Sequence, residues 1–345
     1  METKQIYKVQ GISLDERDTR DFLNERILNV TLRLSNNCNF TCEYCSYYDN
    51  KVKPIPVKEL ISFLYKFIES ISFSGKYDKI NWYIHGGEPT IYPRFLETML
   101  HIGACHDLFN LDYEIEVQTN SSYKKYEHFA VLRNVKISFI CSYQNHQNTK
   151  DQFLNFVSFM AEHNMLAGID LILENFGTKN EFENIEYVFN ELHRLRETNN
   201  HYFNIQTNTI DGVSLDSIDS RYKTFALNKE HSELLEIEYT DGTKEIEDFD
   251  TFTSEGRNKF KLFKCNVGQN SLIIDTTDDL TIKVYKCFSD ILYQKNKPDI
   301  KFIFNEESLA SDIENIKKLL KPTICIHPKC ICELQIPKTK TPKRI

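Results

Sequence analysis

The stretch ILNVTLRLSNNCNFTCEYC, residues 27–45, determines how the chain is interpreted. Residues 27–34 are rich in branched apolar side chains, which predicts a buried β-strand. Cys38, Cys42 and Cys45 follow this strand directly, in the spacing C-x3-C-x2-C. In parallel α/β folds the loops at the carboxyl ends of strands carry the functional residues. We therefore expect the three thiolates to converge on one metal centre.

Three thiolates on one loop favour a soft metal centre, either an iron–sulfur cluster or zinc. An iron–sulfur cluster of four irons would keep one iron without a protein ligand. The alternative is a zinc site completed by a distant histidine, because the loop itself contains none.

Strand-like and helix-like periods alternate after this point. We predict strands at 27–34, 80–84, 113–118, 135–142, 166–173 and 202–208, with helices at 57–68, after Pro93, at 123–132, at 153–160 and at 182–195. Six strands alternating with five helices are typical of parallel βαβ units. We expect an α/β fold, namely a partial (β/α)6 barrel of the TIM type.

The pattern changes after about residue 210. YTDGT (239–243) predicts a hairpin with a two-residue Asp-Gly turn. Residues 271–287 predict a second hairpin, and a helix is expected around 308–320. We expect one domain over residues 1–225, with its core at 25–210, and a small α+β domain with a cysteine-bearing hairpin over 226–345.

Composition excludes several classes of function. The formal net charge of −8 argues against nucleic-acid binding, which needs lysine and arginine to neutralise phosphates. The sequence shows no signal peptide and no membrane-spanning apolar segment, so we expect a cytoplasmic protein. Its ten cysteines are then not expected to form disulfides, and the eight that fall in two groups are expected to bind metal. Cys105 and Cys141 stand apart and are expected to be buried in the core.

A second motif, WYIHGGEPT (82–90), follows the second predicted strand. Together with the cysteine loop, in which Tyr44 precedes the last cysteine, it resembles the radical S-adenosylmethionine (SAM) superfamily. The resemblance implies a 4Fe–4S cluster on the three cysteines, with the methionyl amine and carboxylate of SAM on the open iron. It also implies reductive cleavage of SAM to a 5′-deoxyadenosyl radical, which abstracts hydrogen from a substrate.

The resemblance extends to individual cofactor-binding residues. Gly86 and Gly87 lack Cβ atoms and let the backbone approach a ligand closely. Glu88 is placed to accept hydrogen bonds from the methionine amine. Strand ends supply the further cofactor contacts Thr119, Asn120 and Ser142.

Cys265 and Cys287 bracket the second predicted hairpin and resemble the start of a SPASM or twitch auxiliary-cluster domain. CIHPKCIC (325–332) adds three more cysteines. We expect an auxiliary 4Fe–4S or 2Fe–2S cluster on Cys265, Cys287, Cys330 and Cys332, with Cys325 as the alternative ligand. A structural zinc knuckle remains open, and His327 is a less favoured ligand beside so many cysteines.

The substrate is expected inside the barrel, where water can be excluded. Residues at later strand ends that can line this space are Tyr143, His146, Glu174 and Gln206. The resemblance implies a peptide or a small polar metabolite as substrate and a reductase of the flavodoxin type as electron donor; no catalytic residue is assigned. Two alternatives are a cluster-binding accessory protein without turnover and a zinc-containing binding protein.

Overall fold

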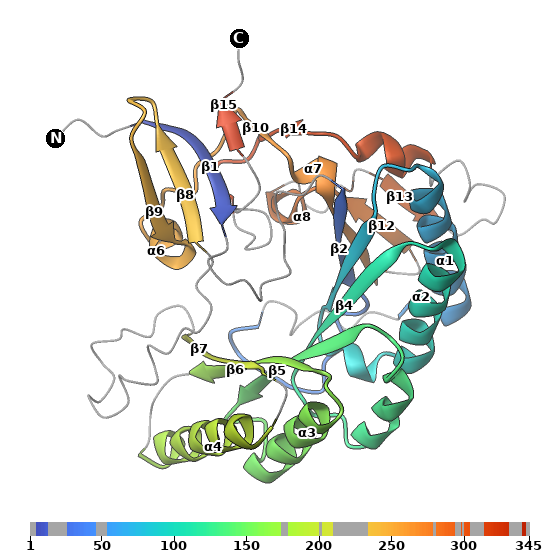
Figure 1. Ribbon diagram of the computed structural model, residues 1–345, viewed down its shortest axis with the longest axis vertical. Helices are drawn as coiled ribbons and strands as arrows, with labels where there is room; N and C mark the ends of the chain where they lie inside the picture. Colours follow the sequence, from blue (N-terminus) through green and yellow to red (C-terminus); the bar gives the residue numbers. More distant parts are fainter. Residues whose placement is uncertain are drawn as a thin grey trace.

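The computed structural model describes residues 5–12, 26–45, 54–173, 179–199, 202–209, 234–278, 281–293, 298, 300–303, 314–330 and 340–342. Its centre is a nine-stranded sheet (Figure 1). The strands follow the order β13 (Ile300–Ile303), β12 (Thr281–Tyr285), β11 (Ser271–Asp278), β2 (Ile27–Arg33), β3 (Lys79–His85), β4 (Asp112–Thr119), β5 (Ile137–Gln144), β6 (Leu166–Leu173) and β7 (Asn204–Thr209). From β2 to β7 each strand pairs in parallel with the next one along the chain, which confirms the predicted α/β fold with a parallel sheet.

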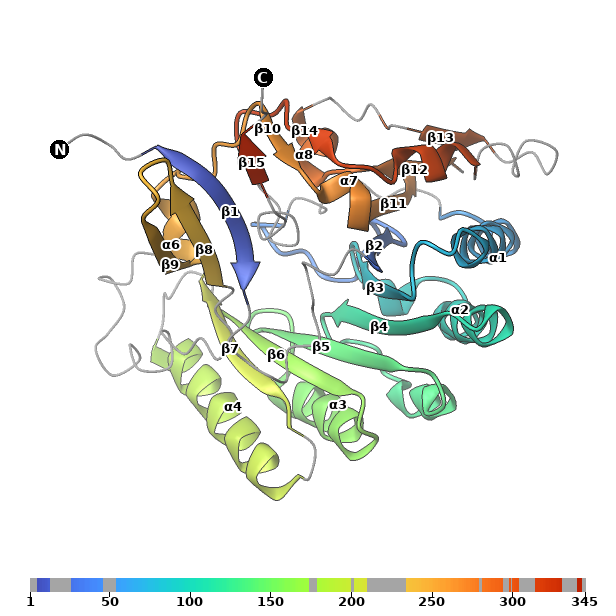
Figure 2. The ribbon, with the colours of Figure 1, turned by 45° about the horizontal axis from the view of Figure 1, so that its top comes forward.

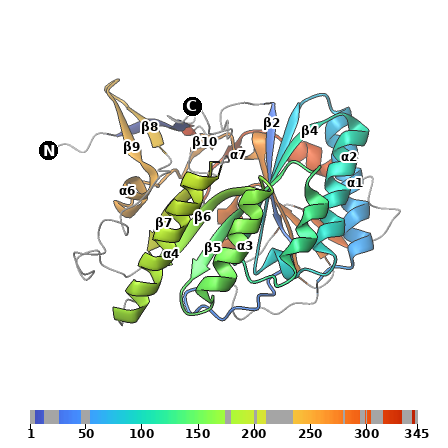
Figure 3. The ribbon, with the colours of Figure 1, turned by 60° about the horizontal axis from the view of Figure 1, so that its bottom comes forward.

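Five helical segments connect the six parallel strands. They are α1 (Val57–Phe73), α2 (Phe95–Phe109), η2 (Tyr126–Leu132), α3 (Lys150–Glu162) and α4 (Lys179–Thr198). The helices cover one side of the sheet, as Figure 2 shows for α1 to α4 and Figure 3 for α3 and α4 in front of the strands. The predicted helix at 123–132 is the short 3-10 helix η2. The aromatic side chains of Phe129 and Tyr126 pack there against Phe156, which holds this segment in place of a longer α-helix.

The two faces of the sheet differ in chemistry because successive side chains of a strand point to opposite sides. Leu28, Val30 and Leu32 of β2 and Trp82 of β3 belong to the large apolar core under the helices. The alternate positions carry polar side chains, which are buried on the other face. These are Asn29, Thr31, Arg33, Asn81, Ser142, Asp170, Ser271, Asp275 and Lys283.

The predicted hairpin over 271–287 joins this sheet directly. Its first strand, β11, pairs in parallel with β2, from Ser271 opposite Asn29 to Asp275 opposite Arg33. The Arg33 guanidinium donates to the Asp275 carboxylate at 2.8 Å, and both side chains are 7% exposed. The hairpin that precedes Cys287 is therefore fixed to the strand that precedes Cys38. The predicted domain boundary at 225/226 lies outside the described residues.

A second sheet has the order β14 (Thr323–Ile324), β10 (Phe263–Cys265), β15 (Lys340–Pro342), β1 (Ile6–Ile12), β8 (Leu234–Tyr239) and β9 (Lys244–Asp248). It brings segments from both ends of the sequence side by side, since Val9 pairs with Lys340 (Figure 1). The short helix α6 (Phe249–Ser254) lies against it, and Phe252 and Phe260 stack in its small core.

The hairpin β8–β9 corrects one expectation. The Tyr239 N–H donates to the Thr243 carbonyl at 2.9 Å, so three residues, not two, form the turn. Gly242 has φ +81° at the third of these positions, the left-handed conformation that such three-residue turns require. Among the described residues, no helix is long and apolar enough to cross a membrane.

Candidate functional site

The cysteine loop after β2 lies against the turn after β3. The Gly87 N–H donates to the Ser35 carbonyl at 2.7 Å, and the Glu88 N–H donates to the Asn37 carbonyl at 2.8 Å. A Cβ on Gly86 would lie 2.3 Å from the Ser35 oxygen, and one on Gly87 would lie 2.3 Å from the Asn37 oxygen. Because the two glycines have no Cβ, the backbone of the cysteine loop can pack closely against them. The motif alone did not reveal this contact within the protein.

Glu88 is fully buried at the centre of this arrangement. One carboxylate oxygen accepts from the Thr90 N–H at 2.9 Å, the Thr90 hydroxyl at 2.5 Å and the Thr119 hydroxyl at 2.8 Å. The other oxygen accepts from the Asn120 N–H at 2.6 Å. Burial raises the pKa of Glu88 above its usual value, and these hydrogen bonds oppose the rise. The carboxylate therefore ties η1 (Pro89–Ile91) to the end of β4.

The thiol of Cys38 receives two N–H groups. The Phe40 backbone N–H and the Asn120 side-chain amide donate to its sulfur, with donor–sulfur distances of 3.4 Å and 3.6 Å. The pKa of Cys38 is raised to about 11, chiefly by burial and also by the charges of Glu88, Cys42 and Cys45, while the hydrogen bond from Phe40 opposes the rise. Cys42 and Cys45 thus lie near enough to affect the pKa of Cys38, although the three sulfur atoms are not all within 4.8 Å of one another. Soft donors with hydrogen-bonded sulfur fit an iron–sulfur cluster.

A polar network behind the loop was not expected from the sequence. Asn39 accepts from the Asn120 amide at 3.1 Å and donates to the Ser122 hydroxyl at 2.8 Å. The amide of Asn148 donates to the Asn120 carbonyl at 3.0 Å, and its side-chain oxygen accepts from the Gln144 N–H at 2.8 Å. The run of short polar residues after β4, TNSS at 119–122, was the available signal.

The remaining cofactor candidates lie in different surroundings. Thr119 and Asn120 meet Glu88, as described above, whereas Ser142 lies on β5 opposite Asp170 of β6. Tyr44 is 40% exposed beside Cys45. Tyr44 thus belongs to the cysteine loop itself, and Thr119 and Asn120 meet the Gly86–Glu88 turn beside it.

The expected substrate-lining residues also separate. Tyr143 is buried, and its hydroxyl donates to Asn145. Gln206 donates to Asp170 across β6 and β7, on the polar face of the sheet. His146 is exposed, and Glu174 lies outside the described residues. Gln206 is the one that shares a face with Ser142 and Asp170.

The described late cysteines also gather. Cys265 ends β10, and the Cys325 N–H donates to the Phe263 carbonyl of that strand at 2.8 Å. Burial raises the pKa of Cys325, as does the nearby Cys265. Burial raises the pKa of Cys287 strongly, and the charges of Cys330 and Asp290 add to the rise. Cys325 therefore lies near Cys265, and Cys287 near Cys330, while Cys332 lies outside the described residues.

One further group at this place has metal-ligand geometry. Potential donor atoms of Cys287, Asp290 and His327 all lie within 4.8 Å of one another, the one group of three that meets this criterion among the described residues.

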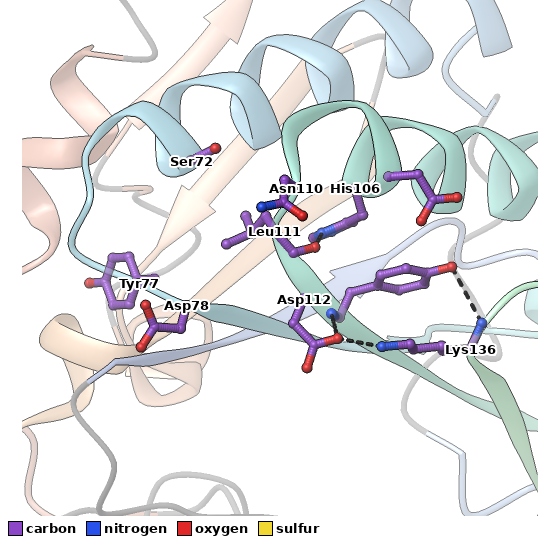
Figure 4. Close-up of a pocket in the computed structure, with 10 residues that line it drawn as sticks. Ser72, Tyr77, Asp78, His106, Asn110, Leu111, Asp112 and Lys136 are labelled. Atoms are coloured by element: carbon purple, nitrogen blue, oxygen red, sulfur yellow. Dashed lines mark hydrogen bonds and ion pairs between the residues drawn. The ribbon is translucent and has the colours of Figure 1, made fainter.

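A cavity of about 540 Å³ lies elsewhere (Figure 4). Its lining includes Asp78, Asp112 and Lys136, which stand at the amino ends of β3, β4 and β5. Lys136 donates to Asp112 at 2.5 Å across its rim. The cysteine loop lies at the carboxyl ends of the same sheet, so this cavity is separate from the candidate site.

Comparison with protein families identifies the class of this site. Residues 32–144 match the model of the radical SAM superfamily. This span contains the three early cysteines, the Gly86–Glu88 turn and strands β3 and β4. Residues 32–144 of the chain are therefore similar to the radical SAM superfamily. No curated protein sequence matches the chain.

Several solved structures are similar to parts of the chain. A polyhistidine-tagged form of anSMEcpe with bound AdoMet is 17% identical with a TM-score of 0.40, and the match covers 53% of this chain and 51% of that one. Native anSMEcpe with bound AdoMet and the Kp18Cys peptide is 14% identical with a TM-score of 0.48, covering 86% and 84%. Streptococcus suis SuiB bound to S-adenosylmethionine is 14% identical with a TM-score of 0.46, covering 84% and 63%. The chain spans about half the length of the first of these.

Proposed function

We propose that the protein is a radical SAM enzyme. The observation that carries the proposal is the contact between the cysteine loop and the Gly86–Glu88 turn. Within the span that matches the superfamily, Gly87 and Glu88 donate to Ser35 and Asn37. Cysteine loop and glycine turn, far apart in sequence, thereby form one site.

Cys38, Cys42 and Cys45 are the residues that would hold a 4Fe–4S cluster. When bound, such a cluster supplies the electron that cleaves SAM into methionine and a 5′-deoxyadenosyl radical, which takes a hydrogen atom from the substrate. The Phe40 and Asn120 N–H groups stabilise the thiolate form of Cys38 by donating to its sulfur. Glu88 keeps Asn120 in place through the backbone N–H of that residue.

The polar face of the parallel sheet supports a polar substrate. Buried Asp170, Ser142 and Arg33 lie on this face, and polar and charged side chains of this kind can hydrogen-bond a polar ligand but not an apolar one. We assign the substrate to the peptides or small polar metabolites and place it beside this face, within a partial barrel formed by β2 to β7. Ser142 and Tyr44 stay candidates for contacts with SAM.

The late cysteines form the second part of the proposal. Cys265, Cys287, Cys330 and Cys332, with Cys325 as the alternative ligand, would hold an auxiliary iron–sulfur centre in a SPASM-like or twitch-like segment. Two such centres require a reducing compartment and a reductase, so a cytoplasmic protein served by a flavodoxin-type donor is consistent with this proposal.

The test is the formation of 5′-deoxyadenosine. Protein reconstituted anaerobically with iron and sulfide is reduced and incubated with SAM, and the product is quantified by mass spectrometry. The variant Cys38→Ala/Cys42→Ala/Cys45→Ala is expected to form none, whereas Cys105→Ala, which changes a buried thiol of α2, keeps the activity.

Two results would contradict the proposal. Stoichiometric zinc without sulfide at the early loop would identify a zinc-binding protein. Intact clusters without 5′-deoxyadenosine would identify a cluster-binding accessory protein.

A further inference from the structure

The late cysteine site contains a buried histidine–aspartate pair that the proposed function does not use. His327 Nε2 lies 2.6 Å from Asp290 Oδ1. The two residues are 6% and 8% exposed. Burying a carboxylate and an imidazole is unfavourable unless both have hydrogen-bond partners. The two side chains are therefore expected to keep this mutual contact.

The backbone brings this pair to the thiols from two separate segments. Asp290 lies in α8 (Phe288–Tyr293), and its N–H donates to the Cys287 carbonyl at 3.0 Å. His327 lies between Cys325 and Cys330, and the Cys325 thiol lies 3.8 Å from the His327 carbonyl oxygen. The histidine–aspartate pair therefore joins the two segments that supply these three cysteines.

The spacing of the donors is that of ligands on one metal atom. Metal–sulfur and metal–nitrogen bonds of usual length place neighbouring ligand atoms of a tetrahedral site roughly 3.3 to 3.8 Å apart. The donors of Cys287, Asp290 and His327 all lie within 4.8 Å of one another. Only a small movement of Cys287 and His327 is needed to bring a donor atom of each onto one ion, with Asp290 beside them.

The hydrogen bond to Asp290 gives the three residues different roles. A histidine that binds metal through one ring nitrogen usually donates its other N–H to a carboxylate, which fixes the orientation of the ring. His327 Nε2 lies toward Asp290, so in this arrangement the metal would be bound through Nδ1 and Asp290 would hold the ring. We propose that His327 is a nitrogen ligand of the late metal centre, on the same metal atom as Cys287, and that Asp290 is its positioning residue.

This assignment rests on the auxiliary centre of the proposed function but not on SAM cleavage. A neutral imidazole in place of a thiolate removes one negative charge from an iron–sulfur cluster and raises its reduction potential. The late centre is thus an iron–sulfur cluster with mixed thiolate and imidazole ligands.

The experiment isolates the late centre. In the background Cys38→Ala/Cys42→Ala/Cys45→Ala, the early loop binds no cluster, so iron, sulfide and spectra report the late centre alone. Pulsed EPR of the reduced protein is expected to show a nitrogen hyperfine coupling from a directly bound imidazole. His327→Cys, which offers a sulfur instead, is expected to retain the cluster, lose the coupling and lower the potential.

Two further variants separate ligation from folding. Asp290→Asn is expected to weaken metal binding roughly 10-fold to 100-fold, the usual effect of removing the partner of a metal-bound histidine. His128→Gln, at an exposed position on η2, is the control and leaves the spectrum unchanged. Unfolding temperatures of the metal-free variants show whether each one folds.

The outcomes are separable. A cluster without nitrogen coupling, a coupling that persists in His327→Cys, or a background protein that binds no metal would each overturn the ligand assignment. Zinc without sulfide would refute the auxiliary cluster, and X-ray absorption would then test the same nitrogen ligand on zinc. Failure of the wild type to cleave SAM would refute the proposed function and leave this test unaffected.

Discussion

The early and the late cysteine sites are built in opposite ways. The early site comes from one continuous loop, residues 34–45, which rests on the ends of two neighbouring strands. The late site takes its thiols from β10, from the start of α8 and from residues 325–330, which no single element connects. The first is a local feature supported by the sheet, whereas the second exists only when distant segments have assembled. This difference explains why the sequence identifies the ligands of the early site but leaves the ligand set of the late site open.

The largest expected difference between the sites concerns activity. Replacing Cys38, Cys42 and Cys45 with alanine should abolish 5′-deoxyadenosine formation, because no ligand set remains for the SAM-binding cluster. Cys287→Ala should retain SAM cleavage and lose only the late centre. Product assays with iron and sulfide analysis measure both. A late-site variant that also loses SAM cleavage, with its early cluster intact, would show that the sites are not independent.

A second prediction concerns the ion pair that joins the two regions. Arg33→Met should destabilise the protein by roughly 3 to 5 kcal/mol, because it leaves the Asp275 carboxylate buried without its cation. The double variant Arg33→Met/Asp275→Leu should recover much of this loss. Denaturant unfolding of the single and double variants gives the coupling. Additive losses would mean that the pair does not link β2 to β11.

Acid should weaken the parallel sheet through His106. Its Nδ1 faces the Leu111 carbonyl at 2.9 Å and its Nε2 accepts from the Trp82 N–H at 2.9 Å, which fixes the neutral ring. Burial lowers the pKa of His106 to about 4, below the usual value of 6.5. The unfolded state therefore binds the proton first, and stability falls as the pH drops from about 6.5 to about 4. The loss is on the order of 3 kcal/mol.

Unfolding at several pH values tests this expectation. His106→Gln should be less stable near pH 7 and show a shallower fall in stability over that window. His128→Gln, at an exposed position, serves as the control. An unchanged slope in His106→Gln would assign the acid sensitivity to other groups.

The smallest effect is expected at the contact between the two motifs. Gly87→Ala places a Cβ 2.3 Å from the Asn37 oxygen and 2.6 Å from the Asn36 oxygen, so the cysteine loop must shift. Such overpacking costs about 1 to 3 kcal/mol. Gly168→Ala is the matched control, because its nearest contact is at 3.7 Å. Thermal unfolding and cluster content together report the shift. Equal unfolding temperatures and cluster contents in the two variants would show that the close contact at Gly87 is not needed.

The sequence predicts the parallel sheet well because its strands are short apolar runs separated by amphipathic helices. Leu28, Val30 and Leu32 all point to one buried core, and local periodicity is enough to recognise this. The cysteine loop is equally easy to recognise in the sequence, because its expected ligands lie within eight residues, 38–45. Both inferences depend on neighbours in the chain.

Features that depend on distant partners were not predicted. The sequence SLIIDTTD (271–278) does not indicate that this strand pairs in parallel with β2. The register between the two strands becomes clear only from the structure, where Asp275 contacts Arg33. Glu88 was expected to face SAM, yet four donors from Thr90, Thr119 and Asn120 surround its carboxylate. The sequence disfavours His327 as a ligand because it lies beside so many cysteines, and it does not reveal the Asp290 partner, which lies in a different segment.

The second sheet has a consequence for the order in which the protein is made. Cys265 pairs with Lys340 on one side and with Thr323 on the other. Strand β1 can pair with β8 only after β8 has been synthesised. During synthesis on the ribosome, the early loop and its supporting strands emerge while most of the chain is still to be made. The second sheet is complete only after β15 has been added. The early loop can therefore meet β3 and β4 before the sheet that contains Cys265 is finished.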